Sequence, residues 1–563
     1  MIMKTNTIEC RTEISRRSFL VGGGTLAAAV AAFGLAGCAE TQQPTNEYLP
    51  SAWDHETDIV VVGYGGAGAA AAIAAKQEDL GDAIVLEAAP EEGAGGNTRV
   101  SGNLMFIPDE AAQAIKYQSS LNGAYKVEDD LLQAWADELV KNKEWVEGLG
   151  GDVQQMPLYS PEFPDSEGSE AVKTYCVDGE FSSPSLWNLL KEQESELDLK
   201  VLYNTRATKL VFNPVTKEVF GVIATDESGT EKTIKARKGV VLSCGGFENN
   251  LEMMQTYGEI GISEMRFIGT PFNRGDGFAM IEPLGAKLWH MSNMAGNGFG
   301  VRGAGSDFNG VSMFSTPKTK DFIFVGPDGK RFMYEEKTAE QRHGKVFRRG
   351  AWLNFPTPTP TYCIFGEDTF TNSPFVSSKT IVSYIGANQL LIAEDNQGLL
   401  EEGIIIKADT IEELAEKIGY TPEVLKNTLD TYNTNAQAGS DPEFDRGTVV
   451  HDSFVARNVV GETDEENVLV PAFDLTPIEG PFYAIELVPR VYNTQGGPKR
   501  TGKGEVTDGE GVPIPRLCAA GEFGCVYSYM YNGGGNVSEA ISSGRIAART
   551  IGSLEPWDAG SGK

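Results

Sequence analysis

The stretch that decides the fold is Thr57–Gln77, which reads TDIVVVGYGGAGAAAAIAAKQ. Its β-branched start, Thr57–Val62, predicts a buried strand, and the alanine-rich end predicts a helix. Between them, Gly63–Gly68 fits the pattern G-x-G-x-x-G of a dinucleotide-binding turn. A second strand, Ala83–Leu86, ends at Glu87, about 20 residues after the glycines, where an acid accepts hydrogen bonds from a ribose. This order of elements predicts a Rossmann-type α/β fold.

Each glycine of the turn has a separate expected task. Gly63 permits the tight turn, Gly65 lets a pyrophosphate approach the backbone, and Gly68 lets the helix pack closely on the strand. The helix N-terminus then faces the phosphates. The alternative, a glycine-rich turn without a ligand, is disfavoured because strand, turn, helix, strand and acid all occur in order.

Length and charge set the protein class. The chain has 563 residues and a formal charge of −32, and one hydrophobic core rarely exceeds about 300 residues, so we expect more than one domain. A content of 41% hydrophobic and 22% charged residues excludes a disordered chain, a fibrous repeat and a polytopic membrane protein. The acidity argues against a nucleic-acid partner, whose phosphates it would repel.

The first residues have the features of a bacterial export signal. Ser15–Leu20 reads SRRSFL, the apolar run Val21–Gly37 follows, and Leu35–Cys38 reads LAGC. These predict a twin-arginine lipoprotein signal peptide over residues 1–37, a lipid anchor at Cys38 and a linker over residues 38–54. We therefore expect a cofactor protein at the extracytoplasmic face of the cell membrane.

Cysteines and histidines do not form metal motifs. The sequence has no C-x-x-C, no C-x-x-C-H haem site and no H-E-x-x-H, so neither a metal nor an attached haem is expected. The cysteines outside the first 38 residues and the four histidines are scattered: Cys176, Cys244, Cys363, Cys518, Cys525, His55, His290, His343 and His451.

Further glycine-rich segments indicate whether the cofactor is FAD or a nicotinamide. They are Gly95–Asn103, Gly239–Phe247, Pro515–Glu522 and Asn532–Asn536. A cofactor that contacts segments so far apart in sequence is long and buried, which favours FAD.

With Gly275–Gly277, Gly329–Phe332 and Thr494–Gly497, these motifs resemble the flavoprotein family of fumarate reductases, urocanate reductases and 3-ketosteroid dehydrogenases. The resemblance implies an FAD-binding domain over residues 55–285 and 488–553, with an inserted α+β cap over residues 286–487 and a tail over 554–563. It implies non-covalent FAD held by Gly63, Gly65, Gly66, Ala67, Gly68, Glu87, Ala88, Gly95, Gly96, Asn97, Thr98, Ser101, Gly102, Gly245, Gly246, Asp276, Gly521, Glu522, Asn536 and Val537.

Two motifs depart from the fumarate-reducing branch. Residues 492–497 read YNTQGG, where that branch has H-x-T-M-G-G, and Asn532 replaces the arginine that binds a carboxylate. A small dicarboxylate needs cationic, bidentate partners, so fumarate is not the expected substrate.

The segment Tyr531–Gly535 instead has the Y-x-G-x-G spacing of ketosteroid dehydrogenases. There the tyrosine hydroxyl and the last glycine N–H bind the substrate ketone, as an oxyanion hole does. The alternative is that Tyr531 only packs beside the flavin. The predicted substrate contacts are Tyr492, Asn493, Tyr527 and Tyr529.

The resemblance implies hydride transfer from flavin N5 to the C=C bond of a large enone such as a 3-oxosteroid. Arg342 is the predicted proton donor, and Tyr334, His343 and Tyr529 are its rivals; a solvent salt bridge is the other interpretation of Arg342. Because haem motifs are absent, electrons must come from a separate donor, such as a membrane multihaem cytochrome.

Three alternatives stay open. One is a respiratory reductase of an unsaturated carboxylate (like cinnamate, urocanate or fumarate), with Arg302, Arg348 or Arg490 as the cation. The second is a ketosteroid dehydrogenase that works in the oxidative direction. The third is non-enzymatic: a lipid-anchored flavin carrier, or a binding lipoprotein that kept the fold.

Overall fold

The computed structural model describes most of the chain after the linker. Its residues are 48–157, 160–164, 166–181, 183–258, 266–267, 269–295, 298–302, 311–313, 317, 319–333, 335, 345–348, 351–354, 358–375, 395–444, 446 and 475–559. The predicted leader and Cys38 lie outside them. Within the described part, no helix is long and apolar enough to cross a bilayer.

The larger sheet is built around the strand that opens the sequence argument. Its strands are β1 (His55–Val62), β2 (Ala83–Leu86), β6 (Lys200–Leu202), β7 (Arg206–Phe212), β8 (Val219–Thr225), β9 (Glu231–Leu242), β23 (Glu505–Thr507) and β24 (Pro513–Ala519). The core order β24-β9-β1-β2-β6 is parallel, and β23, β8 and β7 extend it antiparallel. Val60 pairs with both Ile84 and Val240. All three are buried, as expected of a parallel sheet covered on both faces.

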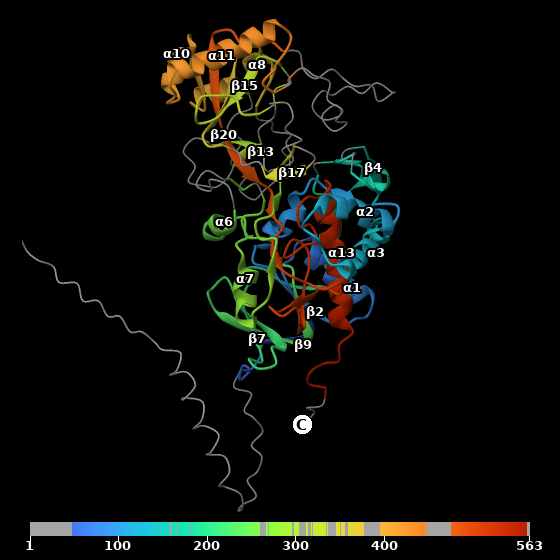
Figure 1. The fold of residues 1–563 in the computed structure, drawn as a ribbon. Coiled ribbons are helices and arrows are strands. Elements are labelled where there is room, and N and C mark those ends of the chain that lie inside the picture. Colours follow the sequence, from blue (N-terminus) through green and yellow to red (C-terminus); the bar gives the residue numbers. More distant parts are fainter. Residues whose placement is uncertain are drawn as a thin grey trace, which may run out of the picture. The chain divides into compact units, whose positions relative to one another are not determined.

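Two helices rich in small residues lie side by side on this sheet (Figure 1). They are α1 (Gly66–Gln77) and α13 (Gly535–Gly552). A Cβ atom on Gly544 would lie 2.2 Å from the carbonyl oxygen of Ala67, so only glycine allows this close approach. The N-termini of both helices belong to predicted cofactor segments.

The remaining elements of this part are shorter. A three-stranded sheet has the order β3-β5-β4, and β11 pairs with β22 and β12 with β21. The bounds are α2 (Ala111–Asn122), α3 (Asp129–Leu139), α4 (Asn142–Gly148), α5 (Ser185–Glu196), α6 (Leu251–Tyr257), α7 (Asp276–Ile281), β3 (Leu104–Phe106), β4 (Val153–Met156), β5 (Thr174–Val177), β11 (Leu288–Trp289), β12 (Met294–Ala295), β21 (Asn493–Thr494) and β22 (Gly497–Pro498).

A second sheet surrounds the long strand β20 (Phe482–Val491). Alternate residues of β20 enter two hydrophobic clusters: Tyr483 and Ile485 belong to one, and Ala484 to the other, as the two-residue period of a strand requires. Its other elements and the nearby hairpin are β10 (Arg266–Phe267), β13 (Gly298–Arg302), β14 (Val311–Met313), β15 (Phe322–Val325), β16 (Lys345–Arg348), β17 (Ala351–Asn354), β18 (Thr361–Phe365), β19 (Ile405–Ala408), α8 (Glu367–Asn372), α9 (Asn396–Glu401), α10 (Ile411–Lys417) and α11 (Pro422–Gln437).

The fold class is therefore α/β with a parallel sheet, and the sequence prediction is confirmed. The predicted cap boundary at residue 487 falls inside β20, and β10 joins the cap sheet from before residue 286. The domain boundaries stay predictions.

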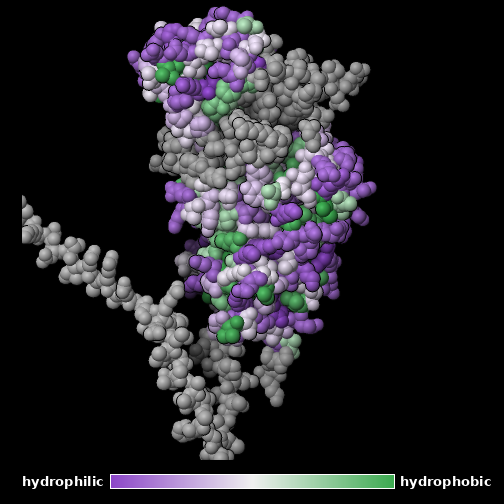
Figure 2. All heavy atoms as spheres, viewed as in Figure 1, coloured by the Kyte–Doolittle hydropathy of each residue, from purple (hydrophilic) through white to green (hydrophobic). Residues whose placement is uncertain are grey.

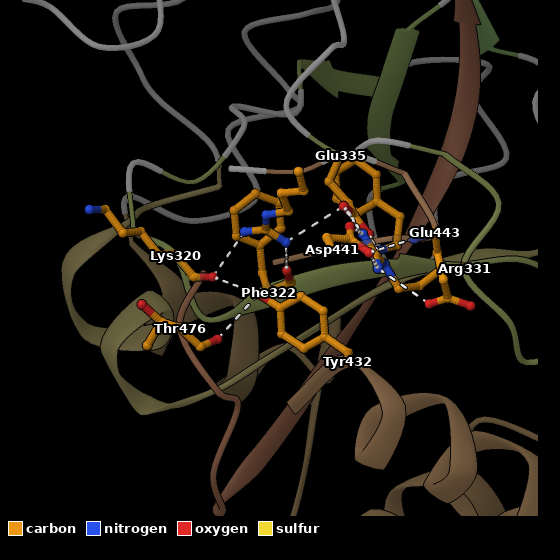
Figure 3. Close-up of polar contacts among 10 residues, drawn as sticks. Lys320, Phe322, Arg331, Glu335, Tyr432, Asp441, Glu443 and Thr476 are labelled. Carbon is orange, nitrogen blue, oxygen red and sulfur yellow. Dashed lines mark hydrogen bonds and ion pairs between the residues drawn. The ribbon is translucent and has the colours of Figure 1, made fainter. Parts of the chain in front are cut away.

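A buried ion network lies in the core of the cap (Figure 3). The Arg331 guanidinium donates to the carboxylates of Glu335 and Asp441, at 2.7 Å and 2.8 Å for the shortest bonds. Arg446 donates to the backbone oxygens of Phe322 and Lys320. The network joins the segment around residue 441 to strand β15.

The face of the molecule seen in Figure 2 is mostly hydrophilic, with hydrophobic residues in separate spots. Among the described residues, the large exposed hydrophobic side chains are far apart in sequence: Tyr125, Val215, Leu251, Leu288 and Val512. Scattered residues of this kind are normal on a folded protein.

Candidate active site

The glycine turn has the geometry that its sequence predicts. Gly63 has a φ of +98°, and a Cβ atom there would lie 2.4 Å from the carbonyl oxygen of Ser243. A Cβ atom on Gly68 would lie 1.9 Å from the carbonyl oxygen of Gly63. At Gly65 the nearest atom to such a Cβ is 3.6 Å away, and Gly65 is only half-buried. Close packing thus requires glycine at positions 63 and 68, whereas a Cβ atom on Gly65 would make only ordinary van der Waals contacts.

The second glycine segment lies against this turn. Gly65 and Gly95 form a parallel β-bridge, and the Gly95 N–H donates to the Tyr64 carbonyl oxygen at 3.1 Å. The Gly66 N–H donates to the Thr98 hydroxyl at 3.0 Å. Gly96, whose φ is +52°, stays half-buried beside Gly65. The loop to Gly102 is closed by a bond from the Ser101 hydroxyl to the Thr98 carbonyl oxygen at 2.8 Å.

Glu87 ends strand β2 with a buried carboxyl group. Its oxygens accept hydrogen bonds from the backbone amides of Tyr64 at 2.6 Å and Ala89 at 2.7 Å. Burial raises the pKa of Glu87, although both amides oppose this shift. The carboxyl group, with Ala88 half-buried beside it, lies where the motif expects a ribose.

A pair of carboxyl groups lies next to the predicted Gly245–Gly246 segment. The Asn97 amide nitrogen donates to Glu248 at 2.9 Å and to Glu522 at 3.0 Å. Asn273 donates to Glu248 at 2.8 Å, and the Thr494 N–H donates to Glu522 at 3.1 Å. Burial raises the pKa of both carboxyl groups, and the charge of Glu248 raises that of Glu522 further. The pair therefore retains a proton more readily than isolated carboxylates.

Sequence reasoning named Glu522 but missed Glu248. The only signal was its position directly after Ser243–Phe247, a motif already assigned to the cofactor. A Cβ atom on Gly246 would lie 2.4 Å from an oxygen of Glu522 and 2.5 Å from one of Glu248, so the glycine is required by this packing. Asp276, the first residue of α7, forms an ion pair with Arg206.

The predicted Tyr531 loop leads into helix α13. The rings of Tyr527 and Tyr531 stack with centroids 5.0 Å apart. A Cβ atom on Gly535 would lie 2.9 Å from the Tyr527 hydroxyl and 3.1 Å from the Tyr531 ring. The Gly535 N–H donates to the Asn532 carbonyl oxygen at 2.9 Å. A substrate oxygen at this amide would have to share its hydrogen, so the oxyanion-hole role of Gly535 stays a prediction.

Asn532 makes structural hydrogen bonds. Its side-chain oxygen accepts from the Tyr117 hydroxyl at 2.8 Å and from the Glu162 N–H at 2.9 Å. The Glu162 carboxylate accepts from the Gly533 N–H at 2.6 Å. Tyr117 and Glu162, which the sequence did not indicate, thus fix the loop that precedes α13.

The predicted substrate residues converge on the same region. The Asn536 side-chain nitrogen donates to the Asn493 oxygen at 3.2 Å, which joins β21 to the first turn of α13. Tyr492 is half-buried, and its N–H donates to the Ala295 carbonyl oxygen at 2.9 Å. Tyr529 stacks on Tyr125, with centroids 4.8 Å apart.

A lysine that sequence reasoning missed also reaches this region. The Lys345 ammonium donates to the Asn293 oxygen at 3.0 Å and lies 4.6 Å from the centroid of the Tyr529 ring. The Asn293 side-chain nitrogen donates to the Tyr527 carbonyl oxygen at 2.9 Å. Nearby, burial lowers the pKa of His290 to about 3, so this ring is neutral and bonds to the Cys525 carbonyl oxygen.

Of the four proposed proton donors, Tyr529 lies among the described residues. Arg342, Tyr334 and His343 lie outside the described residues, as do the side chains of Arg302, Arg348 and Arg490. Among the described residues, no group of three His, Cys, Asp or Glu side chains could hold a metal ion.

Comparison with known proteins decides the family. The sequence model of the FAD binding domain family matches residues 58–538. The chain belongs to this family. It is 27% identical to an NADH:acrylate oxidoreductase of Vibrio harveyi over 89% of this chain, but spans only about half (51%) of that protein's length. It is 28% identical to a 3-oxosteroid 1-dehydrogenase of Mycolicibacterium smegmatis over 88% of this chain and 97% of the relative.

A solved structure has the same fold. It is the 3-ketosteroid Δ1-dehydrogenase of Sterolibacterium denitrificans in complex with 1,4-androstadiene-3,17-dione, with a TM-score of 0.69 and 21% identity. The match covers 88% of this chain and 99% of that one. The family resemblance inferred from the motifs is therefore confirmed. The protein is an FAD-dependent oxidoreductase of a family that acts on CH–CH groups.

The residues of this flavoprotein fit FAD. Gly65 and Gly96 are half-buried and lack a side chain, which suits a pyrophosphate beside the first turn of α1, where Ala67 and Gly68 lie. Gly521 has a φ of +70°, and its N–H donates to the Ser543 hydroxyl at 2.8 Å, which turns the chain toward Glu522 at the end of β24. In the first turn of α13, beside Val537, the buried side-chain oxygen of Asn536 has no hydrogen-bond partner among the described residues. A polar cofactor group would satisfy it.

Proposed function

We propose that the protein reduces the C=C bond of an α,β-unsaturated carbonyl compound with a large apolar body, such as a 3-oxosteroid or another large enone. The observation that carries this proposal is the stack of Tyr527 and Tyr531 against Gly535 at the start of α13. Aromatic walls with a few polar groups suit a large apolar ligand. The tyrosine hydroxyls supply the polar groups here.

FAD, when bound and reduced by the separate electron donor, would supply a hydride to the β-carbon, and a proton would then add to the α-carbon. The task left to the chain is to hold the carbonyl oxygen while negative charge grows on it. In this proposal the Tyr531 hydroxyl donates to that oxygen, because a fixed donor is most effective where charge develops. The proton donor is Arg342, or one of its rivals Tyr334, His343 and Tyr529.

The relatives support a substrate with a carbonyl group beside the reacting carbons. One acts on acrylate and the other on 3-oxosteroids, and both substrates contain a carbonyl group next to the reacting carbons. The structural role of Asn532, at the position of a carboxylate-binding arginine, favours the larger enone over a small dicarboxylate.

A second candidate is the reduction of an unsaturated carboxylate. The observation in its favour is Lys345, which places a positive charge beside Tyr529. A third outcome, steroid dehydrogenation in the oxidative direction, uses the same hydride chemistry in reverse and agrees with the 3-oxosteroid relative.

We further propose that the protein is exported by the twin-arginine route and anchored through a lipid on Cys38, with electrons from a separate donor such as a membrane multihaem cytochrome. The SRRSFL and LAGC motifs support this location. Labelling cells with a fatty-acid analogue tests the anchor. A Cys38→Ser variant that retains the label would contradict it.

The test of the activity is anaerobic stopped-flow spectroscopy. The FAD-loaded protein is reduced chemically and mixed with 3-oxo-Δ4 and Δ1 steroids, an unsaturated lactone, cinnamates, urocanate and fumarate. Recovery of the oxidised flavin band with an enone is the expected result, and Tyr531→Phe should slow it by about 100-fold or more. Tyr420→Phe, a half-buried tyrosine of the cap, is the matched control.

Other outcomes have definite meanings. Reoxidation by carboxylates alone replaces the enone proposal with the second candidate. Reduction of the oxidised flavin by a saturated 3-oxosteroid, with an artificial acceptor for turnover, indicates the oxidative direction. A reduced flavin that no compound reoxidises favours a flavin carrier.

A further inference from the structure

Glu248 is a buried glutamate that follows the predicted Gly245–Gly246 segment. Its exposed fraction is 0%, although glutamate is almost never fully buried unless it is paired. Removing a carboxylate from water costs free energy that a nearby cation normally offsets. Within the described part of the chain, no lysine, arginine or histidine forms an ion pair with this carboxyl group. Its burial therefore needs another explanation.

Two asparagines hold Glu248 beside Glu522. The Asn97 amide nitrogen donates to Glu248 at 2.9 Å and to Glu522 at 3.0 Å. The Asn273 amide nitrogen donates to the same two carboxyl groups, at 2.8 Å and 3.4 Å. Asn97 is fixed in this orientation, because its side-chain oxygen accepts from the Thr270 N–H at 2.9 Å. The two carboxyl groups therefore share their donors and form a pair.

One of the four oxygens of this carboxyl pair has no donor. The asparagines donate to Oε1 of Glu248 and Oε2 of Glu522, and the Thr494 N–H donates to Oε1 of Glu522 at 3.1 Å. Oε2 of Glu248 is buried and has no hydrogen-bond partner among the described residues. A Cβ atom on Gly246 would lie 2.5 Å from this oxygen and 2.4 Å from Oε1 of Glu522. The two oxygens are thus within about 5 Å of each other, a range in which like charges interact strongly.

Two buried carboxyl groups at this separation favour a state with one proton between them, because the second negative charge would be repelled by the first. Burial raises the pKa of both groups, and the charge of Glu248 raises that of Glu522 further. The asparagines and Thr494, which face the pair from other segments, are uncharged. Cys525, a titratable group near Glu522, is neutral because burial raises the pKa of its thiol. A proton on the pair also provides the hydrogen that Oε2 of Glu248 lacks.

The carboxyl pair lies among the predicted FAD contacts. Asn97, Gly246 and Glu522 are residues that the family resemblance assigns to the cofactor, and Glu248 is in contact with this group. Reduction adds two electrons to FAD, so a negative charge in the same buried region opposes it. A pair with one negative charge opposes reduction less than a pair with two.

We propose that Glu248 and Glu522 share one proton, and that this proton determines how readily the bound FAD accepts electrons. The two electrons come from the separate donor, and the shared proton comes from the solvent. When the pH rises and the pair loses its proton, the charge on the pair doubles and the midpoint potential of FAD falls. By linkage, reduction of FAD in turn favours the protonated pair. This inference concerns the cofactor alone and goes beyond the proposed function, because it involves no substrate.

Infrared spectroscopy of the FAD-loaded full chain at a series of pH values tests the shared proton. A protonated carboxyl group absorbs at a different frequency from a carboxylate, and the wild-type spectrum minus that of Glu248→Gln isolates the pair. Other buried acids such as Glu87 are the same in both proteins. Glu522 loses its like-charged neighbour in the variant, so its acid band should disappear at a pH about one unit or more below that of the wild type. The difference spectrum should show the acid band between these two pH values.

The midpoint potential of FAD, measured by reductive titration over the same pH series, tests the coupling. In the wild type it should show an additional fall where the acid band is lost, and in Glu248→Gln this fall should move to the lower pH with the band. Glu522→Gln should behave like Glu248→Gln, because the proton belongs to both groups, and it replaces that variant if it does not retain FAD. Glu423→Gln, at an exposed position of helix α11, is the control and should match the wild type.

Two results would overturn the proposal. If the difference spectrum contains no acid band at any pH, the pair holds no shared proton. If the acid band behaves as expected but the potential depends on pH in the same way in the wild type and in both glutamine variants, the proton has no effect on FAD. Both measurements are made without substrate, so their failure is distinct from a failure of the proposed function in the stopped-flow test.

Discussion

The Arg331 network in the cap allows a stability effect to be worked out from the structure. Four hydrogen bonds join the Arg331 guanidinium to the carboxylates of Glu335 and Asp441. The three side chains are at most 1% exposed (Figure 3). Replacing Arg331 by Met keeps an unbranched, though shorter, side chain and removes the charge, so both buried carboxylates lose their main cation.

The expected cost follows from the loss of one partner in a buried ion pair, which is about 3–5 kcal/mol. Arg446 stays 3.6 Å from Glu335 and offsets part of it, so we expect the lower end, about 3 kcal/mol. For the predicted cap of residues 286–487, which has about 200 residues, this corresponds to a decrease in Tm of about 6–12 °C.

The effect should also depend on pH. Burial alone would raise the pKa of Asp441, but the hydrogen bonds and charge of Arg331 outweigh burial and hold this pKa below its usual value. In the wild type, Asp441 therefore contributes stability above pH 4 that is lost as the pH falls through its lowered pKa. Without Arg331 the pKa of Asp441 shifts upward instead, because burial favours the protonated carboxyl group. The deficit of Arg331→Met should be smaller at pH 5 than at pH 7.5.

The assay is thermal unfolding of the FAD-loaded protein at both pH values, with hydrogen exchange to localise the change to the cap. Lys417→Met breaks an exposed ion pair of the same cap, with Glu413, and is the matched control. The reasoning is refuted if Arg331→Met has the same Tm as Lys417→Met, or if its decrease in Tm is the same at both pH values.

Two shorter predictions concern the FAD-binding part. Gly65→Ala should fold but bind FAD at least about 10-fold more weakly, because a Cβ atom fits there only while no pyrophosphate is present. Gly68→Ala should lower the Tm as well, because its Cβ atom would lie 1.9 Å from a backbone oxygen. Equal FAD content in the wild type and both variants would contradict both predictions. The thiols of Cys363, Cys518 and Cys525 should react with a thiol reagent at pH 8 only after unfolding, because burial raises the pKa of each; rapid labelling of the native protein would disprove this, and a denatured sample controls for reagent activity.

The cofactor half of the site could be predicted because its signals are local. The strand, the glycine turn and Glu87 lie within about 30 residues, and Gly63 and Gly68 are dictated by close contacts with backbone oxygens. Periodicity and turn chemistry encode such features directly. The α/β fold and the choice of FAD as cofactor followed from them.

The groups that sequence reasoning missed depend on contacts between distant segments. Glu248 meets Asn97 across 151 positions, and Glu162 meets Asn532 across 370. Lys345, in the β16–β17 hairpin, donates to Asn293, which lies directly before β12. Nothing near Glu162 or Lys345 in the sequence marks them, since only the folded chain brings them to the tyrosine loop. The bond between Gly535 and Asn532 is likewise a backbone property that no side-chain pattern reports.

Strand β20 connects the cap sheet to the predicted FAD contacts. β20 lies at the centre of the cap sheet, and the chain then runs through Tyr492 into β21. There the Thr494 amide bonds to Glu522 and the Asn493 oxygen to Asn536, which are both predicted FAD contacts. A displacement of β20 would therefore reach these predicted FAD contacts through the hydrogen bonds of Thr494 and Asn493. For this reason we expect the Arg331→Met variant to show a weaker affinity for FAD besides its lower Tm, although Arg331 contacts none of the predicted FAD residues in the described part of the chain. Unchanged FAD affinity in that variant would mean that the cap core and the cofactor site are energetically independent.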